Sequence, residues 1–119
     1  MKKWTVAIVN YKSSVYLKWQ LKILYEFNQK EDFQVVIVDN SRDKFESLRL
    51  FYLSKLYPNV KLIINKPNPK LEGASIQHGK GLDIALQVAK FSSSKFFLTL
   101  DPDCFLLQNE FLGIFEAQI

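Results

Sequence analysis

Two carboxylates one residue apart, Asp101 and Asp103, directly follow a run of apolar and β-branched residues at 96–100. A short apolar run bounded by turn-type residues predicts a strand that is buried on both faces of a sheet. Ligands of open α/β sheets bind at the carboxyl ends of the strands, so the sequence predicts a binding site at this point. Carboxylate oxygens on a turn that Pro102 stiffens are suited to Mg²⁺ or Mn²⁺, which would bridge the oxygens of a phosphate group.

A solvated turn is the alternative interpretation of the same residues. The sequence has 12 acidic residues among 119, so about one pair of acids with this spacing is expected by chance. In a plain turn, Pro102 fixes the backbone and the acids cap the next helix. The other segments of the chain must decide between the two interpretations.

The composition predicts one globular domain that spans residues 1–119. Hydrophobic residues make up 48% of the chain and charged residues 24%, which is ordinary for a soluble protein. No apolar run approaches the roughly 18 residues that cross a bilayer, and the apolar segment near the N-terminus is too short for a signal peptide. The single cysteine, Cys104, excludes an internal disulfide and a cysteine-based zinc site and fits a reducing compartment. We therefore expect a cytoplasmic protein, either free or at the cytoplasmic face of the membrane.

The net charge of +4 favours an anionic ligand or a membrane surface. The lysines are scattered, however, and no run of them exceeds two. A nucleic-acid-binding surface is therefore not indicated.

Apolar runs and helical periodicities alternate along the chain. Continuous apolar runs predict strands at 3–10, 33–38, 60–64 and 96–100. Apolar residues at helical spacing predict four helices. The first is capped by Ser13 or Ser14 and reaches Phe27, the second spans 44–56, the third follows a cap at Ser75, and the last spans 109–119. In the second of these helices the apolar stripe that a core would cover consists of Phe45, Leu48, Tyr52 and Leu56.

This alternation predicts an α/β fold with right-handed crossovers and a doubly wound, mostly parallel sheet, arranged as a three-layer α/β/α sandwich. The last helical segment reaches position 119 without a C-terminal capping signal. The domain is therefore expected to be incomplete at its C-terminus, with the chain cut short after the acidic pair.

Polar residues follow three of the predicted strands, and a parallel sheet brings these strand ends to one edge. The first strand leads into Asn10 and Tyr11, the second into Asp39, Asn40 and Ser41, and the fourth into Asp101 and Asp103. An aromatic side chain can hold a nucleotide base, a carboxylate can accept from a base N–H or a ribose hydroxyl, and a divalent cation can neutralise a diphosphate. The glycine-rich fingerprints of nicotinamide dehydrogenases and P-loop enzymes are absent. The sequence therefore predicts a nucleotide site of another type.

The segments 6–13, 36–41 and 98–103 together resemble the family 2 glycosyltransferases, which have the Rossmann-like GT-A fold. The three segments stand in the family's order and at family-like spacings, and the similarity spans nearly the whole chain. The resemblance implies transfer of a sugar from a nucleotide-diphosphate donor, and a UDP-sugar is the donor we expect. The transfer would usually invert the anomeric centre and use Mg²⁺ or Mn²⁺ as cofactor. The acceptor stays open among saccharides, lipids and proteins.

The resemblance also implies roles for five residues. Val9 and Tyr11 would line the pocket for the base, and Asp39 would bind the base edge or the ribose. Asp101, the first acid of the DxD motif, would approach the ribose and the metal ion. Asp103, the second, would ligate the metal ion directly.

The segment 73–81 resembles the glycine-rich stretch that precedes the third helix of the family. Many members have Asn two residues before the glycine that corresponds to Gly81, whereas this chain has Gly79. His78 or Lys80 is therefore predicted to reach the diphosphate instead, although His78 is alternatively a solvated residue of the helix start. Lys12 likewise stands where Asn is common.

The catalytic base of the family lies beyond the metal-binding segment, so no catalytic residue is assigned in this chain. A nucleotide-sugar-binding module without turnover is one alternative function. An α/β interaction domain, such as a flavodoxin-like receiver, is another, but receivers carry paired acids after the first strand, where this chain has Asn10. An incomplete domain would leave a sheet edge or an apolar face exposed, so a homodimer is also expected.

Overall fold

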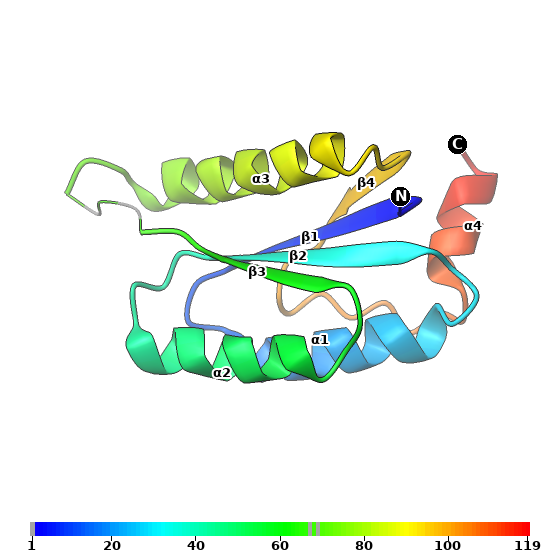
Figure 1. Cartoon of the computed structure of the whole chain (residues 1–119), viewed down its shortest axis with the longest axis horizontal. Helices are drawn as coiled ribbons and strands as arrows, with labels where there is room; N and C mark the ends of the chain where they lie inside the picture. Colours follow the sequence, from blue (N-terminus) through cyan, green and yellow to red (C-terminus); the bar gives the residue numbers. More distant parts are fainter. Residues whose placement is uncertain (1, 67, 69) are drawn as a thin grey trace.

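The structure is a computed structural model that describes residues 2–66, 68 and 70–119. Within these residues the chain forms a four-stranded sheet in the order β3-β2-β1-β4 (Figure 1), and all neighbouring strands are parallel. The strands are β1 (Trp4–Asn10), β2 (Phe33–Asp39), β3 (Val60–Ile64) and β4 (Phe96–Thr99). The predicted α/β fold with a parallel sheet is confirmed.

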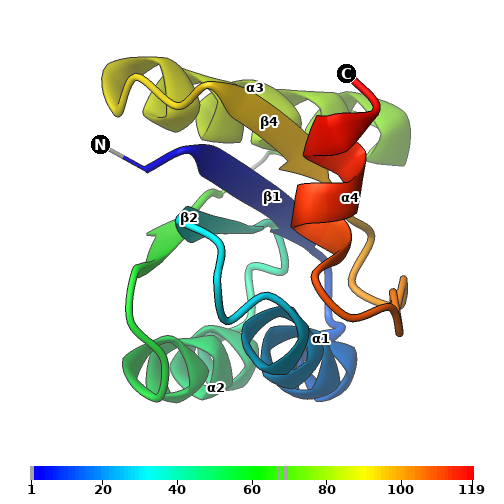
Figure 2. The same ribbon diagram turned by 90° about the vertical axis from the view of Figure 1, so that its right-hand side faces the viewer.

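Helices cover both faces of this sheet. Figures 1 and 2 show α1 (Ser14–Phe27) and α2 (Lys44–Lys55) side by side on one face and α3 (Ala74–Phe91) on the other. A short helix, α4 (Phe111–Ala117), lies at the end of the sheet where the strands begin. The layers therefore have the predicted α/β/α order. No helix among the described residues is long and apolar enough to cross a membrane.

Alternate residues of the central strands face opposite helix layers. Ile8 of β1 packs in the core with α1 and α2, whereas Val9 packs in the core under α3. The same alternation carries past the end of β2. The Asp39 side chain lies on the α2 side, where it accepts a hydrogen bond from Ser47, and the Asn40 side chain lies on the α3 side.

Helix α2 turns a different face to the sheet from the one that its apolar stripe predicts. The four residues of the stripe are between 50% and 74% exposed, namely Phe45, Leu48, Tyr52 and Leu56. The helix instead buries Glu46, Leu50 and Ser54. One reason is that Ser47 Oγ donates to Asp39 Oδ2 over 2.7 Å, which fixes the rotation of α2 about its axis. The predicted buried stripe of this helix is therefore wrong.

Three other details differ from the sequence-based expectations. Helix α3 begins at Ala74 with Gly73 in the N-cap position, two residues before the predicted cap, Ser75. Strand β4 is an edge strand whose apolar residues are half-buried rather than enclosed on both faces. Helix α4 is shorter than predicted because Glu110, with a φ of 55°, has a left-handed backbone that no helix can include.

Helix α4 is joined firmly to the strand-start end of the sheet. Phe111 and Leu112 are buried in the core on the α1–α2 side. The Leu112 amide donates to Asn28 Oδ1 over 3.0 Å, and Lys3 Nζ lies 2.7 Å from Glu116 Oε1. The hydrogen bond with Glu116 raises the pKa of Lys3 above its usual value. Helix α4 thus covers part of the end of the sheet where the strands begin. The polar loops that follow β1, β2 and β4 lie at the opposite end.

Candidate functional site

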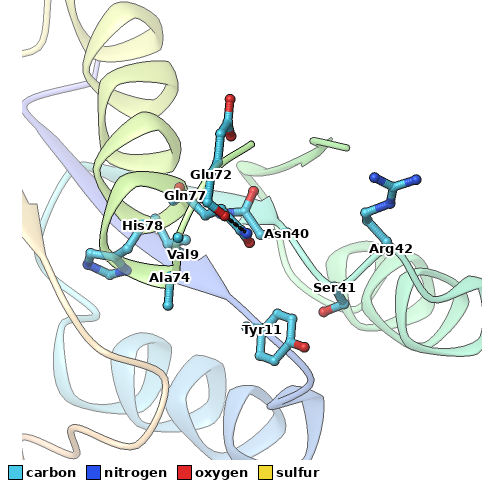
Figure 3. A pocket seen from close by; sticks show the side chains of 10 residues that line it. Val9, Tyr11, Asn40, Ser41, Arg42, Glu72, Ala74, Gln77 and His78 are labelled. Atoms are coloured by element: carbon cyan, nitrogen blue, oxygen red, sulfur yellow. Dashed lines mark hydrogen bonds between the residues drawn. The ribbon is translucent and has the colours of Figure 1, made fainter. Parts of the chain in front are cut away.

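A pocket of about 830 Å³ opens at the carboxyl ends of β1 and β2, beside the first turns of α3 (Figure 3). We call it the strand-end pocket. It is lined by Val9, Tyr11, Asn40, Ser41, Arg42, Glu72, Gly73, Ala74, Gln77 and His78. Helix α1 follows β1 on one face of the sheet, whereas α3 leads to β4 on the other face. The topological switch point of the sheet therefore lies between β1 and β4. Ligands of open α/β folds bind at that point.

Strand β1 supplies the apolar part of the strand-end pocket. Val9 is 6% exposed, and the Tyr11 ring is 60% exposed at the pocket. Lys12 Nζ lies 5.4 Å from the centroid of that ring. An exposed aromatic ring and an apolar side chain that line the same pocket offer a planar ligand a surface on which to stack.

The N-terminus of α3 supplies a wall with free backbone donors. Gly73 is the N-cap residue, makes no side-chain cap hydrogen bond, and is followed by a first turn without acidic residues. Gly73, Ala74, Gln77 and His78 line the pocket. The first N–H groups of a helix attract anions, because they lack partners within the helix and carry the positive end of its dipole.

Asn40 joins the end of β2 to both neighbouring elements. Its Nδ2 donates to the Gln77 carbonyl of α3 over 2.9 Å, and its Oδ1 accepts from Asn65 Nδ2 over 2.8 Å. Helix α3 approaches closely here because Gly81 has no side chain. A Cβ at Gly81 would lie 2.9 Å from Val9 Cγ1 and 3.3 Å from Asn40 Nδ2. The wall of the strand-end pocket thus depends on a glycine in this position.

The Asp39 carboxylate lies beneath the strand-end pocket rather than in it. It is fully buried and does not line the pocket. Its Oδ1 accepts from Asn10 Nδ2 and from both the amide and the hydroxyl of Ser41, at 3.1, 3.1 and 2.6 Å, and its Oδ2 accepts from Ser47. These hydrogen bonds join the turns that follow β1 and β2. The structure therefore gives Asp39 a set of buried partners in place of an open face toward a ligand.

Both turns contain a residue with left-handed backbone. Lys12 has a φ of 53° and Arg42 a φ of 54°. The Lys12 amide donates to Ser41 Oγ over 2.8 Å, so the two turns support each other. Asn adopts this conformation more readily than Lys, so Asn at position 12 would fit the backbone with less strain.

The acidic pair lies on the turn that follows β4. Asp101 and Asp103 are exposed, and neither is among the pocket-lining residues. The last paired residues of β1 and β4 are Ala7 and Thr99, and the Leu100 amide also donates to the Ala7 carbonyl. The same register would bring Asp101 beside Val9. Gln20 Nε2 donates to the carbonyls of Asp101 and Cys104, which holds the backbone of the turn and leaves the carboxylates exposed.

The two predicted diphosphate ligands differ in their surroundings. His78 is exposed and lines the strand-end pocket, and Figure 3 shows it on the opposite side of the pocket from Arg42. The Lys80 ammonium forms an ion pair with the Glu72 carboxylate and does not line the pocket, although Glu72 does. The structure therefore brings His78, but not Lys80, to the pocket wall.

Among the described residues, no group of three or more His, Cys, Asp or Glu side chains is arranged to hold a metal ion. Asp101 and Asp103 provide two exposed carboxylates on one turn. Such a pair fits Mg²⁺ or Mn²⁺ when water and phosphate oxygens complete the coordination.

Solved structures resemble this chain in their fold. Staphylococcus aureus TarS, in a structure of its residues 1–349, superposes with a TM-score of 0.72 at 28% identity, over 97% of this chain and 31% of that one. A second TarS structure gives the same TM-score and identity and is covered to 19%. A mannosyltransferase from Pyrobaculum calidifontis, PcManGT in complex with GDP-Man and Mn²⁺, gives a TM-score of 0.69 at 18% identity, over 94% of this chain and 30% of that one.

The chain has a glycosyltransferase-like fold. It spans about a third of the length of PcManGT and of the shorter TarS structure, at 30% and 31%. No protein-family model matches the sequence, and no curated protein matches it. The family 2 membership that the sequence suggests therefore stays a prediction, whereas the glycosyltransferase-like fold is a finding.

Within this glycosyltransferase-like fold, the sequence reasoning gave roles to three pocket residues, Val9, Tyr11 and His78, and no individual role to the others. Asn40, Gln77 and Arg42 also line the strand-end pocket. The alternation of a strand was the signal for Asn40, because Asn40 follows Val36 and Val38 on the α3 side while Asp39 follows Ile37 on the other. The sequence carries no comparable signal for Arg42 or Gln77.

Proposed function

We propose that the strand-end pocket binds the nucleoside diphosphate of a sugar donor, and that this chain is the donor-binding part of a metal-assisted glycosyltransferase. The observation that supports this most strongly is the position of the pocket. It combines an aromatic ring and a helix N-terminus at the carboxyl ends of β1 and β2 of a glycosyltransferase-like sheet, and the turn after β4, the other neighbour of β1, carries two exposed carboxylates.

In this proposal the base stacks on Tyr11 and contacts Val9. The exposed Tyr11 ring and the apolar Val9 side chain, which both line the pocket, support this assignment. Asp39 acts from below, because its hydrogen bonds to Ser41 fix the loop that borders the base. The direct contact of Asp39 with the base or ribose that the sequence predicts would require a ligand to replace one of these bonds.

The diphosphate would lie against the N-terminus of α3. The first backbone N–H groups of α3 and the guanidinium group of Arg42 supply positive potential around this part of the pocket, and His78 can donate a hydrogen bond from its ring. Lys80 joins them if its ion pair with Glu72 opens.

Asp103 and Asp101 would hold Mg²⁺ or Mn²⁺ at the diphosphate, with Asp101 also near the ribose. Their exposure and their shared turn support this, as does the Mn²⁺ in the complex of PcManGT. The bound ion supplies charge neutralisation of the leaving diphosphate. A UDP-sugar is the proposed donor and inversion the proposed outcome, and the acceptor is a saccharide, a lipid or a protein.

Isothermal titration calorimetry of the chain with uridine diphosphate tests this function. We expect binding in the presence of Mn²⁺ that weakens by about tenfold or more when EDTA is added. The Asp103→Asn variant should show the same loss. Asp83, an exposed acid of α3, provides the matched control, and Asp83→Asn should bind like the unchanged chain. Binding that is independent of Mn²⁺, or equally weakened in both variants, would refute the metal-assisted donor site.

A further inference from the structure

Helices α1 and α2 expose an apolar surface that the fold does not use. Each of its members is at least 50% exposed, and we call the set the α1–α2 surface: Val15, Trp19, Phe45, Leu48, Tyr52 and Leu56. Four of these residues form the stripe that the helical periodicity predicts to be core. A regular apolar stripe that remains exposed marks a surface that another molecule covers.

Basic side chains surround this surface. In α1 and α2, all of whose residues the structure describes, five basic residues are exposed: Lys18, Lys22, Lys44, Arg49 and Lys55. The same helices contain two acids, of which Glu46 is buried and Glu26 is exposed. Lys22 Nζ and Lys18 Nζ lie 5.6 and 6.0 Å from the centroid of the Trp19 ring. The surface is therefore apolar and aromatic in its middle and positively charged around it.

A groove between the helices has the same character. Its volume is about 680 Å³, and its apolar lining includes Val15, Tyr52 and Leu56. Lys18, Arg49 and Lys55 also line it, and none of its lining residues is acidic. A groove with an apolar floor and cations at its rim fits a molecule that carries both a hydrocarbon part and a negative charge.

We propose that the α1–α2 surface docks onto a membrane that contains anionic phospholipid. Trp and Tyr are favoured at the level of lipid headgroups, and Lys extends its charged end to the phosphates while its stem covers apolar surface. Each basic residue near an anionic bilayer adds to the attraction. The two helices lie side by side in one layer (Figure 2), so their outer faces can meet a flat bilayer together.

Other occupants fit the charges less well. Protein interfaces are depleted in Lys, whereas four of the five cations here are Lys. A second copy of the chain would bring two positively charged surfaces together, which like-charge repulsion opposes. The membrane proposal does not depend on the function of the strand-end pocket. Val15 and Phe45 lie in the first turns of α1 and α2, so a docked membrane would lie close to the loops that border that pocket.

Sedimentation with vesicles tests the proposal. The chain should sediment with vesicles of phosphatidylcholine mixed with phosphatidylglycerol and not with phosphatidylcholine alone. Both Arg49→Glu/Lys55→Glu and Leu48→Ser/Tyr52→Ser should lower the partition coefficient by about tenfold or more. The altered side chains are exposed, so thermal unfolding should change little.

The opposite layer offers matched controls. Lys90 is the basic residue in the last turn of α3, as Lys55 is in α2, and Phe91 is 92% exposed. Lys90→Glu and Phe91→Ser should leave vesicle binding unchanged. Absence of binding to the anionic vesicles, or an equal loss in these controls, would overturn the proposal. Self-association that Leu48→Ser/Tyr52→Ser abolishes, without vesicle binding, would assign the surface to a second copy and overturn it as well.

The two tryptophans supply a test without mutation. Trp19 is 51% exposed on the α1–α2 surface, whereas Trp4 is 3% exposed in the core. Lipids brominated on their acyl chains, mixed into the anionic vesicles, should quench part of the fluorescence, the part that Trp19→Phe removes. Unquenched fluorescence in bound protein would show that another surface makes the contact.

Discussion

The ends of β2 and β4 both carry acidic residues, but the two ends hold them in opposite ways. At the end of β2 the Asp39 side chain is buried and accepts hydrogen bonds from Asn10, Ser41 and Ser47. At the end of β4 the backbone is held, because Gln20 donates to the carbonyls of Asp101 and Cys104, and the carboxylates are exposed.

This difference teaches which acids build a site and which can act in it. A carboxylate that already has several buried donors stabilises the loops around it, and replacing those donors with a ligand brings little gain. An exposed carboxylate on a held turn keeps its oxygens available for a cation. The comparison supports a structural role for Asp39 and agrees with the metal-binding role proposed for Asp103, and three substitutions test the difference between the two strand ends.

Replacing Asp39 should have the largest effect on stability. Asp39→Ala removes the acceptor of the Ser41 amide and of the Ser41 and Ser47 hydroxyls and leaves Asn10 Nδ2 only Ser41 Oγ. We expect a loss of about 3 kcal/mol or more in the free energy of unfolding. Urea denaturation followed by circular dichroism measures it. Asp103→Ala should change the same quantity by about 0.5 kcal/mol at most. Equal urea midpoints for the two variants would remove the distinction between the strand ends.

Loss of Gln20 should have an intermediate effect that is confined to the β4 end. Gln20 is 1% exposed, and Gln20→Ala leaves two backbone carbonyls without its amide, which should cost about 2 kcal/mol. Hydrogen exchange should become faster in the turn 101–104, where the Cys104 amide donates to the Asp101 carbonyl. Faster exchange in the turn that follows β2 instead would contradict the assignment.

Two glycines of α3 should respond with opposite signs. Gly81→Ala forces a methyl group against Val9 and Asn40, so a packing penalty of about 2 kcal/mol outweighs a gain in helix propensity of about 1 kcal/mol. A Cβ at Gly79 would have no neighbour within 4 Å, so Gly79→Ala should stabilise the chain by about 1 kcal/mol. Thermal unfolding distinguishes them, and nucleotide binding should fall only in the Gly81 variant. A stabilising Gly81→Ala with unchanged binding would mean that the pocket wall is not tightly packed.

The strand segments were predictable because buried parallel strands form continuous apolar runs. The α/β/α order of the layers was predictable because these runs alternate with helical segments. Alternation along a strand also predicts which face of the sheet each side chain lies on. The sequence reasoning nevertheless chose Asp39 because it is an acid, whereas its neighbour Asn40 lines the strand-end pocket. The rotation of α2 was not predictable from its own periodicity. This rotation depends in part on the hydrogen bond between Ser47 and Asp39. The apolar stripe of α2 is exposed as a result and forms most of the α1–α2 surface.

Anomalous scattering from Mn²⁺ tests the central claim most directly. In crystals of the chain grown with uridine diphosphate and Mn²⁺, we expect an anomalous peak at the carboxylates of Asp101 and Asp103, with the diphosphate toward the N-terminus of α3 and the uracil against Tyr11. A peak at another part of the surface, or a nucleotide bound away from the strand-end pocket, would contradict the account.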